Sequence, residues 1–264
     1  MPESIIPPNN AKRALKEGKS LVGLMVVEIR QASVMQMVAN AGYDFVIIDN
    51  EHGPFNIETI AELSRNARKV GLTPIVRVPE WSYAHITQPL DAGAQGIMAP
   101  RITGAQQVRD ILQVMKYPPV GRRGSVTARG HTDLKSGPIL DAMKSANEES
   151  MLVVQIETRQ ALENMDEILS VPGVDVALIG PTDLSVSLGI GGEMRDPKLI
   201  AAIESTIEAC KQHKVFPAIH MNPLELAASW AGKGMRMVSC SSEVGMMVQA
   251  GSAAVAAIRK GFGG

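Results

Sequence analysis

The chain of 264 residues has few cysteines, few aromatic residues and almost no excess of either charge. Its two cysteines, Cys210 and Cys240, are too few for a disulfide framework and fit a reducing compartment. The 26 basic and 27 acidic residues give a formal net charge of −1, and no run of Lys or Arg stands out. We therefore expect no nucleic acid and no anionic membrane surface as a partner.

Long apolar runs are missing as well. No segment contains the roughly 20 consecutive apolar residues that a membrane-spanning helix requires. The first ten residues are interrupted by prolines and have no long apolar stretch, which argues against a signal peptide. These absences predict a soluble, cytoplasmic protein.

Patterns typical of strands and helices alternate along the rest of the chain. Strands are predicted over residues 22–27, 45–49, 74–78, 96–99, 152–157, 176–180, 216–220 and 235–239. Helices are predicted over 31–41, 57–70, 84–92, 105–115, 161–169, 199–213, 223–232 and 243–259. Eight strands, each followed by a helix without a linker, predict one α/β domain over residues 1–264, a (β/α)8 TIM barrel. A doubly wound open sheet would alternate too, but it usually has fewer strands.

One connection in this pattern is unusually long. Residues 117–150, between predicted strands four and five, are rich in Pro and Gly, and 139–146 within them are expected to form a helix. A connection of this length is usually functional or carries extra helices.

Polar side chains follow the predicted strands at the point where each strand ends. The apolar run 45–48 is followed directly by Asp49, Glu51 and His52. The ends of other strands carry Glu28, Arg77, Arg101, Gln155, Glu157, Asp183, His220, Ser239 and Cys240. Because the carboxyl ends of parallel barrel strands meet at one mouth, where chemistry takes place, these residues predict a single site.

Two carboxylates in this set are candidates for a metal site. Glu157 and Asp183 end neighbouring strands, and together with water they suit a hard divalent ion such as Mg²⁺ or Mn²⁺. A structural zinc would need a Cys/His set, which this chain lacks. The alternative is that Glu157 caps the turn after its strand and that Asp183 is the N-cap of a short helix over 184–188.

Three further features are candidates for acid–base chemistry and for anion binding. His52 is the best general base, and Asp49 three residues earlier would fix its tautomer; the alternative is a solvent-facing loop histidine. Arg77 needs an anionic partner, which is either a substrate oxygen or an internal carboxylate. The backbone around Gly180, Pro181 and Thr182 would bind a carboxylate at a helix N-terminus, although a plain turn explains it equally well.

The distribution of lysine separates two ways in which such a site could activate a carbonyl substrate. A Schiff-base enzyme needs a desolvated lysine in its site. None of the 12 lysines stands in a predicted strand or at its carboxyl end. The sequence therefore favours metal-assisted enolisation of a 2-oxo acid, in which Arg77 would stabilise the developing enolate oxygen.

Six sequence stretches resemble the HpcH/HpaI aldolases, the class II pyruvate aldolases of the phosphoenolpyruvate/pyruvate-binding barrel superfamily. The stretches are IDNEH (48–52), IVRVP (75–79), LDAGAQGIMAP (90–100), YPPVGRRG (117–124), QIET (155–158) and IGPTDLS (179–185). They stand in the expected order, and the resemblance extends over nearly the whole chain. It implies a reversible, divalent-metal-dependent cleavage of a 4-hydroxy-2-oxo acid to pyruvate and an aldehyde through a metal-stabilised enolate.

The resemblance also assigns roles to individual residues. It makes Glu157 and Asp183 the metal ligands, for Mg²⁺ or Mn²⁺ with Co²⁺ or Zn²⁺ as alternatives. It makes His52 the base and Asp49 its partner. The pyruvate-binding residues that it implies are Arg77, Gln155, Gly180, Pro181 and Thr182. Asp91 matches an aspartate that completes the site across a subunit interface, and the assembly implied is a homohexamer.

The chain departs from the family at strands seven and eight. His220 and Asn222, with the Ser-Cys-Ser-Ser segment 239–242, replace residues that are more apolar in the heptanedioate and sugar-acid aldolases. His220 either binds the aldehyde half of the substrate or is a core histidine. Two other functions therefore stay open beside the aldolase: an oxaloacetate decarboxylase that forms the same enolate, and a non-catalytic 2-oxo acid binder.

Overall fold

The protein is built around a closed barrel of eight parallel strands. In the computed structural model, which describes residues 4–262, each strand pairs with its neighbour in sequence, and the eighth closes onto the first. The strands are β1 (Leu21–Val26), β2 (Phe45–Asp49), β3 (Thr73–Arg77), β4 (Gly96–Ala99), β5 (Met151–Ile156), β6 (Val176–Ile179), β7 (Phe216–His220) and β8 (Met237–Ser242). The predicted TIM barrel is confirmed. Strand β8 is displaced from the predicted 235–239, because Met235 still belongs to the preceding turn and donates to the Trp230 carbonyl.

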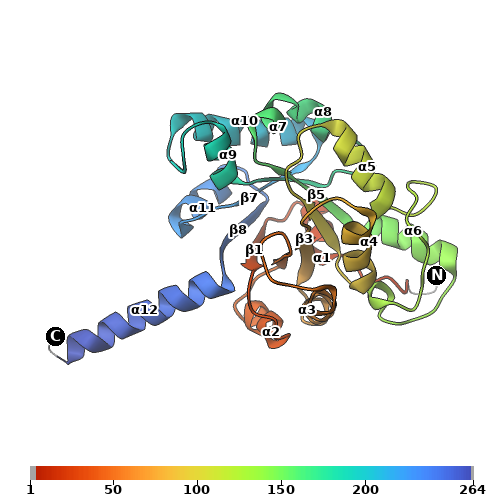
Figure 1. Cartoon of the computed structure of the whole chain (residues 1–264), viewed down its shortest axis with the longest axis horizontal. Coiled ribbons are helices and arrows are strands. Elements are labelled where there is room, and N and C mark those ends of the chain that lie inside the picture. The colour runs from red at the N-terminus through yellow and green to blue at the C-terminus, as the bar shows by residue number, and fades with distance from the viewer. Residues whose placement is uncertain (1–3, 263–264) are drawn as a thin grey trace.

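Helices follow the strands around the outside of the barrel (Figure 1). They are α1 (Asn10–Lys16), α2 (Ser33–Asn40), α3 (Ile57–Lys69), α4 (Tyr83–Ala92), α5 (Ala105–Met115), α6 (Ile139–Glu149), α7 (Arg159–Glu163), α8 (Met165–Leu169), α9 (Pro181–Ser187), α10 (Pro197–His213), α11 (Leu224–Ala231) and α12 (Glu243–Gly261). The short helix α1, capped by the Asn9 side chain, was not predicted. The helix predicted over 161–169 is divided at Asn164, whose side chain donates to the Thr103 carbonyl.

Side chains that point into the barrel form an apolar layer with a polar layer above it. Successive residues of a strand point to opposite faces, so Ile47 and Asp49 of β2 both face inward, as do Ile75 and Arg77 of β3. The same two-residue step recurs on three further strands, where Gln155 follows Val153, Gly180 follows Leu178 and His220 follows Ala218. The barrel register thus brings polar residues that are distant in sequence to one end of the barrel.

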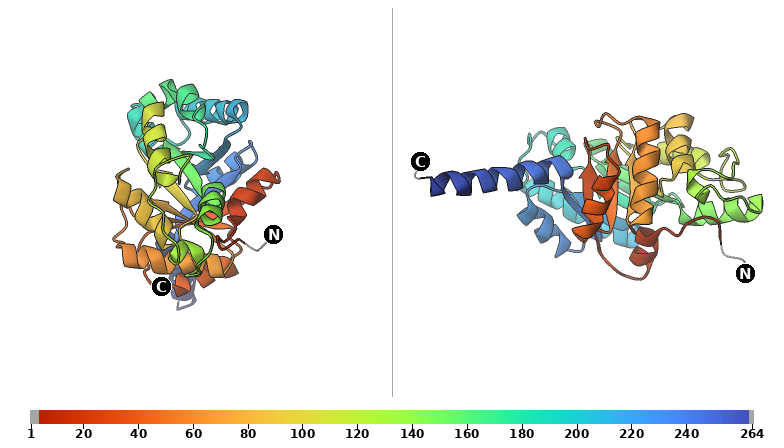
Figure 2. Two further views of the ribbon diagram at one scale, coloured as in Figure 1. Left: turned by 90° about the vertical axis from the view of Figure 1, so that its right-hand side faces the viewer. Right: turned by 90° about the horizontal axis from the view of Figure 1, so that it is seen from below.

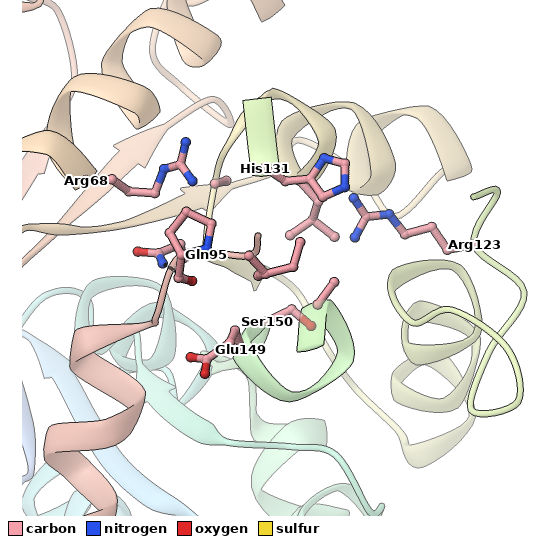
Figure 3. Close-up of a pocket in the computed structure, with 11 residues that line it drawn as sticks. Arg68, Gln95, Arg123, His131, Glu149 and Ser150 are labelled. Atoms are coloured by element: carbon pink, nitrogen blue, oxygen red, sulfur yellow. Dashed lines mark hydrogen bonds between the residues drawn. The ribbon is translucent and has the colours of Figure 1, made fainter. Parts of the chain in front are cut away.

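The long connection between β4 and β5 is present as expected and includes α6 and a 3-10 turn (Gly130–Thr132). It encloses a small cavity of about 30 Å³ beside α4 and the N-terminal segment. Figure 3 shows Arg68, Arg123 and His131 along one side of this cavity and Glu149 and Ser150 along the other. Its volume is enough for about one water molecule, so it is too small to be a substrate site.

Helix α12 differs from the other long helices because it extends away from the barrel (Figures 1 and 2). Its first residue, Glu243, is buried and accepts backbone N–H bonds from Val27, Glu28 and Ile29, which anchors the helix beside β1. From residue 247 to residue 262 every side chain is exposed. Within residues 4–262, no helix is long and apolar enough to cross a membrane.

Candidate active site at the barrel mouth

A cavity of about 250 Å³ opens at the carboxyl ends of the strands. Its apolar lining is contributed by the inner barrel residues Met25, Ile47, Met98 and Leu178. Its polar lining consists of the side chains of Arg77, Gln155, Thr182, Asp183, His220 and Asn222 and of the backbone of Gly180 and Pro181. The structure thus brings together the predicted site residues of β3, β5, β6 and β7.

Arg77 is paired with carboxylates before any substrate binds. Its Nε and Nη2 donate to the two Asp49 oxygens at 2.9 and 2.7 Å, and its Nη1 lies 3.4 Å from Glu51 Oε2. Burial disfavours the guanidinium charge, but the hydrogen bonds with Asp49 and the nearby carboxylates outweigh it and raise the pKa of Arg77. Of the two partners considered for Arg77, the structure shows the internal carboxylate, and a contact with a substrate oxygen stays a prediction.

The same geometry corrects the predicted role of Asp49. Its carboxylate also accepts the backbone N–H groups of Glu51 and His52, at 3.0 and 3.4 Å. Burial raises the pKa of Asp49, but the bonds from Arg77 and from the backbone outweigh burial and lower it. In the described structure no hydrogen bond joins Asp49 to the His52 ring, which is directed toward solvent with its side chain 71% exposed. Asp49 therefore orients Arg77 and the loop after β2. The predicted contact by which Asp49 would fix the tautomer of His52 was wrong.

Glu157 is a buried carboxylate directly above β5. Its Oε1 accepts the backbone N–H of Arg101 at 2.6 Å, and its Oε2 accepts the side-chain amide of Gln155. Arg101 has a φ of +55°, a strained conformation that directs this N–H toward the carboxylate. Burial raises the pKa of Glu157 to about 7, with support from the negative charges of Asp183 and Glu51.

Asp183 belongs to the first turn of α9. Gly180 is the N-cap of this helix and Pro181 its first residue, so the alternative of Asp183 as the N-cap of a helix over 184–188 is wrong. Gly180 must be small, since a Cβ there would lie 2.9 Å from both Gln155 Nε2 and Glu157 Oε2. The exposed Asp183 side chain lines the cavity, and the buried Glu157 adjoins the cavity through its hydrogen bond with the lining residue Gln155.

Comparison with known proteins identifies the family. The sequence model described as HpcH/HpaI aldolase/citrate lyase matches residues 23–250. The chain belongs to the HpcH/HpaI aldolase/citrate lyase family. The resemblance inferred from the six motifs is thus confirmed.

Individual relatives match this family member over almost their entire length. It is 36% identical to a 4-hydroxy-2-oxo-heptane-1,7-dioate aldolase of Klebsiella pneumoniae, with 94% of this chain and 93% of the relative covered. It is 32% identical to a hydroxypyruvate/pyruvate aldolase of Roseobacter denitrificans, with 97% and 99% covered. The crystal structure of an HpcH/HpaI aldolase from Desulfitobacterium hafniense superposes with a TM-score of 0.90 at 32% identity, with 94% and 96% covered.

The residues of this HpcH/HpaI protein fit a divalent ion that retains water ligands. Gln155 Oε1 is buried and has no hydrogen-bond partner among the described residues. It adjoins Glu157, whose pKa is raised by burial and by its acidic neighbours. A cation here would give Gln155 Oε1 a partner and favour the ionised form of Glu157. No group of three or more His, Cys, Asp or Glu side chains with metal-binding geometry occurs in residues 4–262. Two carboxylates and few other ligands are typical of Mg²⁺ sites.

Four predicted residues of this family member are absent from the cavity lining. Asp49 and Glu157 contact the lining residues Arg77 and Gln155, and the other two are His52 and Asp91. The His52 side chain is 71% exposed, and its Nε2 is 4.0 Å from Glu51 Oε2. Asp91, near the end of α4, pairs with Arg123 at 2.5 Å and does not line the cavity of its own chain. Glu51 was the residue overlooked, since it was noted at the strand end without a role. Its ion pairs with Arg77 and Arg101 depend on loop geometry that no sequence pattern specifies.

Proposed function

We propose that this protein is a class II pyruvate aldolase, which reversibly cleaves a 4-hydroxy-2-oxo acid to pyruvate and an aldehyde. The observation that carries the proposal is the arrangement of Arg77, Gln155 and Asp183 around one cavity, with Glu157 beside it. Two aldolases of the family support it, since each is about a third identical to the chain over nearly its whole length.

Glu157 and Asp183 would hold a divalent metal ion, Mg²⁺ or Mn²⁺, with Gln155 Oε1 close by. When bound, such an ion acts as a Lewis acid on the oxygens of a 2-oxo acid. Arg77, oriented by Asp49, would donate to the oxygen that becomes negative as the enolate forms. The backbone of Gly180, Pro181 and Thr182 would position the pyruvate carboxylate.

Cleavage then requires one base. His52 on the loop after β2, with Glu51 as the nearby carboxylate, would accept the proton of the C4 hydroxyl. The C3–C4 bond breaks, its electron pair moves into the enolate of pyruvate, and the aldehyde leaves. Protonation of C3 completes pyruvate, and the reverse sequence forms the bond.

A Schiff-base mechanism has no support in this structure. No lysine lines the cavity among the described residues. Burial lowers the pKa of Lys116 to about 7, but its Nζ donates to Asn147 O, Ser150 O and Ser150 Oγ at 2.7 to 3.0 Å. Ser150 immediately precedes β5, so this lysine lies at the opposite end of the barrel from the cavity.

Exchange of the pyruvate methyl protons tests the proposed half-reaction without knowledge of the aldehyde. In D₂O with Mg²⁺ or Mn²⁺, NMR should show loss of the methyl signal, and EDTA should stop it. No exchange with any divalent ion would contradict the proposal. Turnover of oxaloacetate against a 4-hydroxy-2-oxo acid would then separate a decarboxylase from an aldolase.

We further propose that the protein is a homo-oligomer, a hexamer as the family resemblance implies, in which α12 packs against a second copy. The helix exposes Met247, Val255 and Ile258, at 64%, 48% and 59%. On the barrel, Val22 of β1 is 53% exposed, although barrel strands are normally covered by helices. An exposed apolar residue on a barrel strand and an uncovered apolar helix suit a reciprocal contact between copies.

Introducing a charge on α12 should break this assembly. Val255→Glu is expected to shift the mass in solution, measured by light scattering, toward the monomer. The control is Ala201→Glu, which adds the same charge at an exposed position of α10. A wild-type protein that is monomeric at micromolar concentration would contradict the proposal.

A further inference from the structure

One wall of the cavity carries polar groups for which the proposed reaction has no role. His220 ends β7, and Asn222 follows it two residues later. Both line the cavity, four strands around the closed barrel from Arg77 of β3. The groups assigned to the 2-oxo acid come from β3, β5 and β6, which leaves this wall to the other half of the substrate.

His220 presents a neutral N–H donor to the cavity. Its Nδ1 lies 2.9 Å from Ser239 Oγ, and Ser239 is completely buried. Among the described residues, this hydroxyl has no other hydrogen-bond partner, and we assign it as the donor to Nδ1, because the other tautomer would leave a buried O–H without an acceptor. The proton of the neutral ring is then on Nε2. Burial, with help from the charge of Arg77, lowers the pKa of His220 to about 4, so the ring stays neutral at physiological pH.

Asn222 adds a second neutral donor. Its Oδ1 is occupied, because it accepts the backbone N–H of Ser241 at 3.0 Å and the Cys240 thiol at 3.4 Å. These contacts fix the orientation of the amide and leave its NH₂ group to donate elsewhere. The wall thus offers N–H groups from two side chains and no charge.

The charges around the cavity disfavour a second anion at this wall. Arg77 is the only cationic residue in the lining among the described residues; it pairs with Asp49 and Glu51, and we assign it to the 2-oxo acid. Asp183 also lines the cavity and is acidic. A carboxylate placed against His220 would lose water without gaining a cationic side chain, which is costly. A hydroxyl oxygen accepts the same hydrogen bonds without that cost.

We infer, on the basis of the proposed aldolase function, that His220 and Asn222 bind the hydroxyl group of an uncharged hydroxyaldehyde. The protein then discriminates against aldehydes that end in a carboxylate. This selectivity would distinguish it from relatives named for a 1,7-dioate, whose substrate carries a second carboxylate.

Three small aldehydes separate the contributions of shape, hydrogen bonding and charge. With pyruvate as the common partner, kcat/KM is measured for glycolaldehyde, for propionaldehyde, in which a methyl group replaces the hydroxyl, and for glyoxylate, which is charged. Each kcat/KM is calculated from the concentration of the unhydrated form of the aldehyde. Glycolaldehyde is expected to exceed each of the others by about tenfold, the value of one good hydrogen bond in a binding site.

Variants of His220 assign the preference to its ring. His220→Leu should lower the ratio of glycolaldehyde to propionaldehyde by about tenfold, whereas His220→Gln, which retains a neutral N–H donor, should keep most of it. The ratio is insensitive to a general loss of enzyme activity. The control is His213→Leu at the C-terminal end of α10, where the one hydrogen bond of the ring among the described residues is with Asp166.

The outcomes distinguish this inference from the proposed function. A wild-type preference for glyoxylate, or an unchanged ratio in His220→Leu, overturns the inference while the aldolase stands. If wild-type protein fails to exchange the pyruvate methyl protons with any ion, the aldolase proposal fails and the inference fails with it.

Discussion

Replacing Glu157 by glutamine is expected to abolish metal-dependent turnover while making the metal-free protein more stable near neutral pH. The substitution removes the buried carboxylate assigned to the ion and keeps its shape. The amide of Gln155 can turn so that its unpartnered Oε1 accepts from the new side chain. Loss of a Lewis acid worth several kcal/mol corresponds to a fall in kcat/KM of at least about 10³-fold.

The stability gain follows from the pKa of Glu157. Because that pKa is raised from 4.5 to about 7, the folded protein favours the protonated carboxyl. The associated stability is present below pH 4.5 and is lost as the pH rises through 7. Glutamine cannot ionise, so the variant keeps this stability, which amounts to about 3 kcal/mol at most.

Thermal unfolding in EDTA at several pH values measures the effect. The Tm of Glu157→Gln should exceed that of the wild type by about 5–10 °C at pH 8 and match it near pH 4.5. Glu167→Gln on the exposed surface of α8 controls for the change in net charge. Added Mg²⁺ should raise the Tm of the wild type and leave that of the variant unchanged. Normal turnover in Glu157→Gln would contradict its role as a metal ligand.

The barrel and the composition of its mouth could be predicted from the sequence because both follow from local patterns. The run 45–48 indicates a covered parallel strand, and the period of two along β2 and β3 directs Asp49 and Arg77 inward. Their partnership could not be predicted, since it depends on the register between two strands. Asp49 faces Arg77 across that register, and so it binds the guanidinium rather than the ring three residues away.

Other features are hidden from the sequence for a different reason. The periodicity of α12 is that of an ordinary barrel helix, and only its place in space shows that it leaves the barrel. In the sequence, Ser239 is one residue of a predicted strand. Its hydroxyl can hydrogen-bond to His220 only because the closed barrel places β8 beside β7. Such contacts arise from closure of the barrel, which a single sequence does not encode locally.

Replacing Arg77 by leucine is expected to reduce both stability and catalysis, for separable reasons. Asp49 is 2% exposed and would lose the guanidinium that binds both of its oxygens, and Glu51 would lose one of its two arginine partners. Breaking a buried ion pair on one side costs about 3–5 kcal/mol, because an uncompensated charge stays inside. Urea denaturation should therefore show a lower midpoint, with an unchanged m-value.

A double variant separates the two effects. In Arg77→Leu/Asp49→Leu, no charge of the bidentate pair is left buried, so much of the lost stability should return, as it does when a buried pair is replaced as a unit. Exchange of the pyruvate methyl protons should stay slow in both variants, because the donor to the enolate oxygen is missing from each. Arg77→Lys should recover little exchange, since an ammonium group cannot donate in the bidentate geometry that Asp49 orients. Wild-type stability in Arg77→Leu would show that Asp49 does not depend on this pair, and rapid exchange in the double variant would remove Arg77 from the reaction.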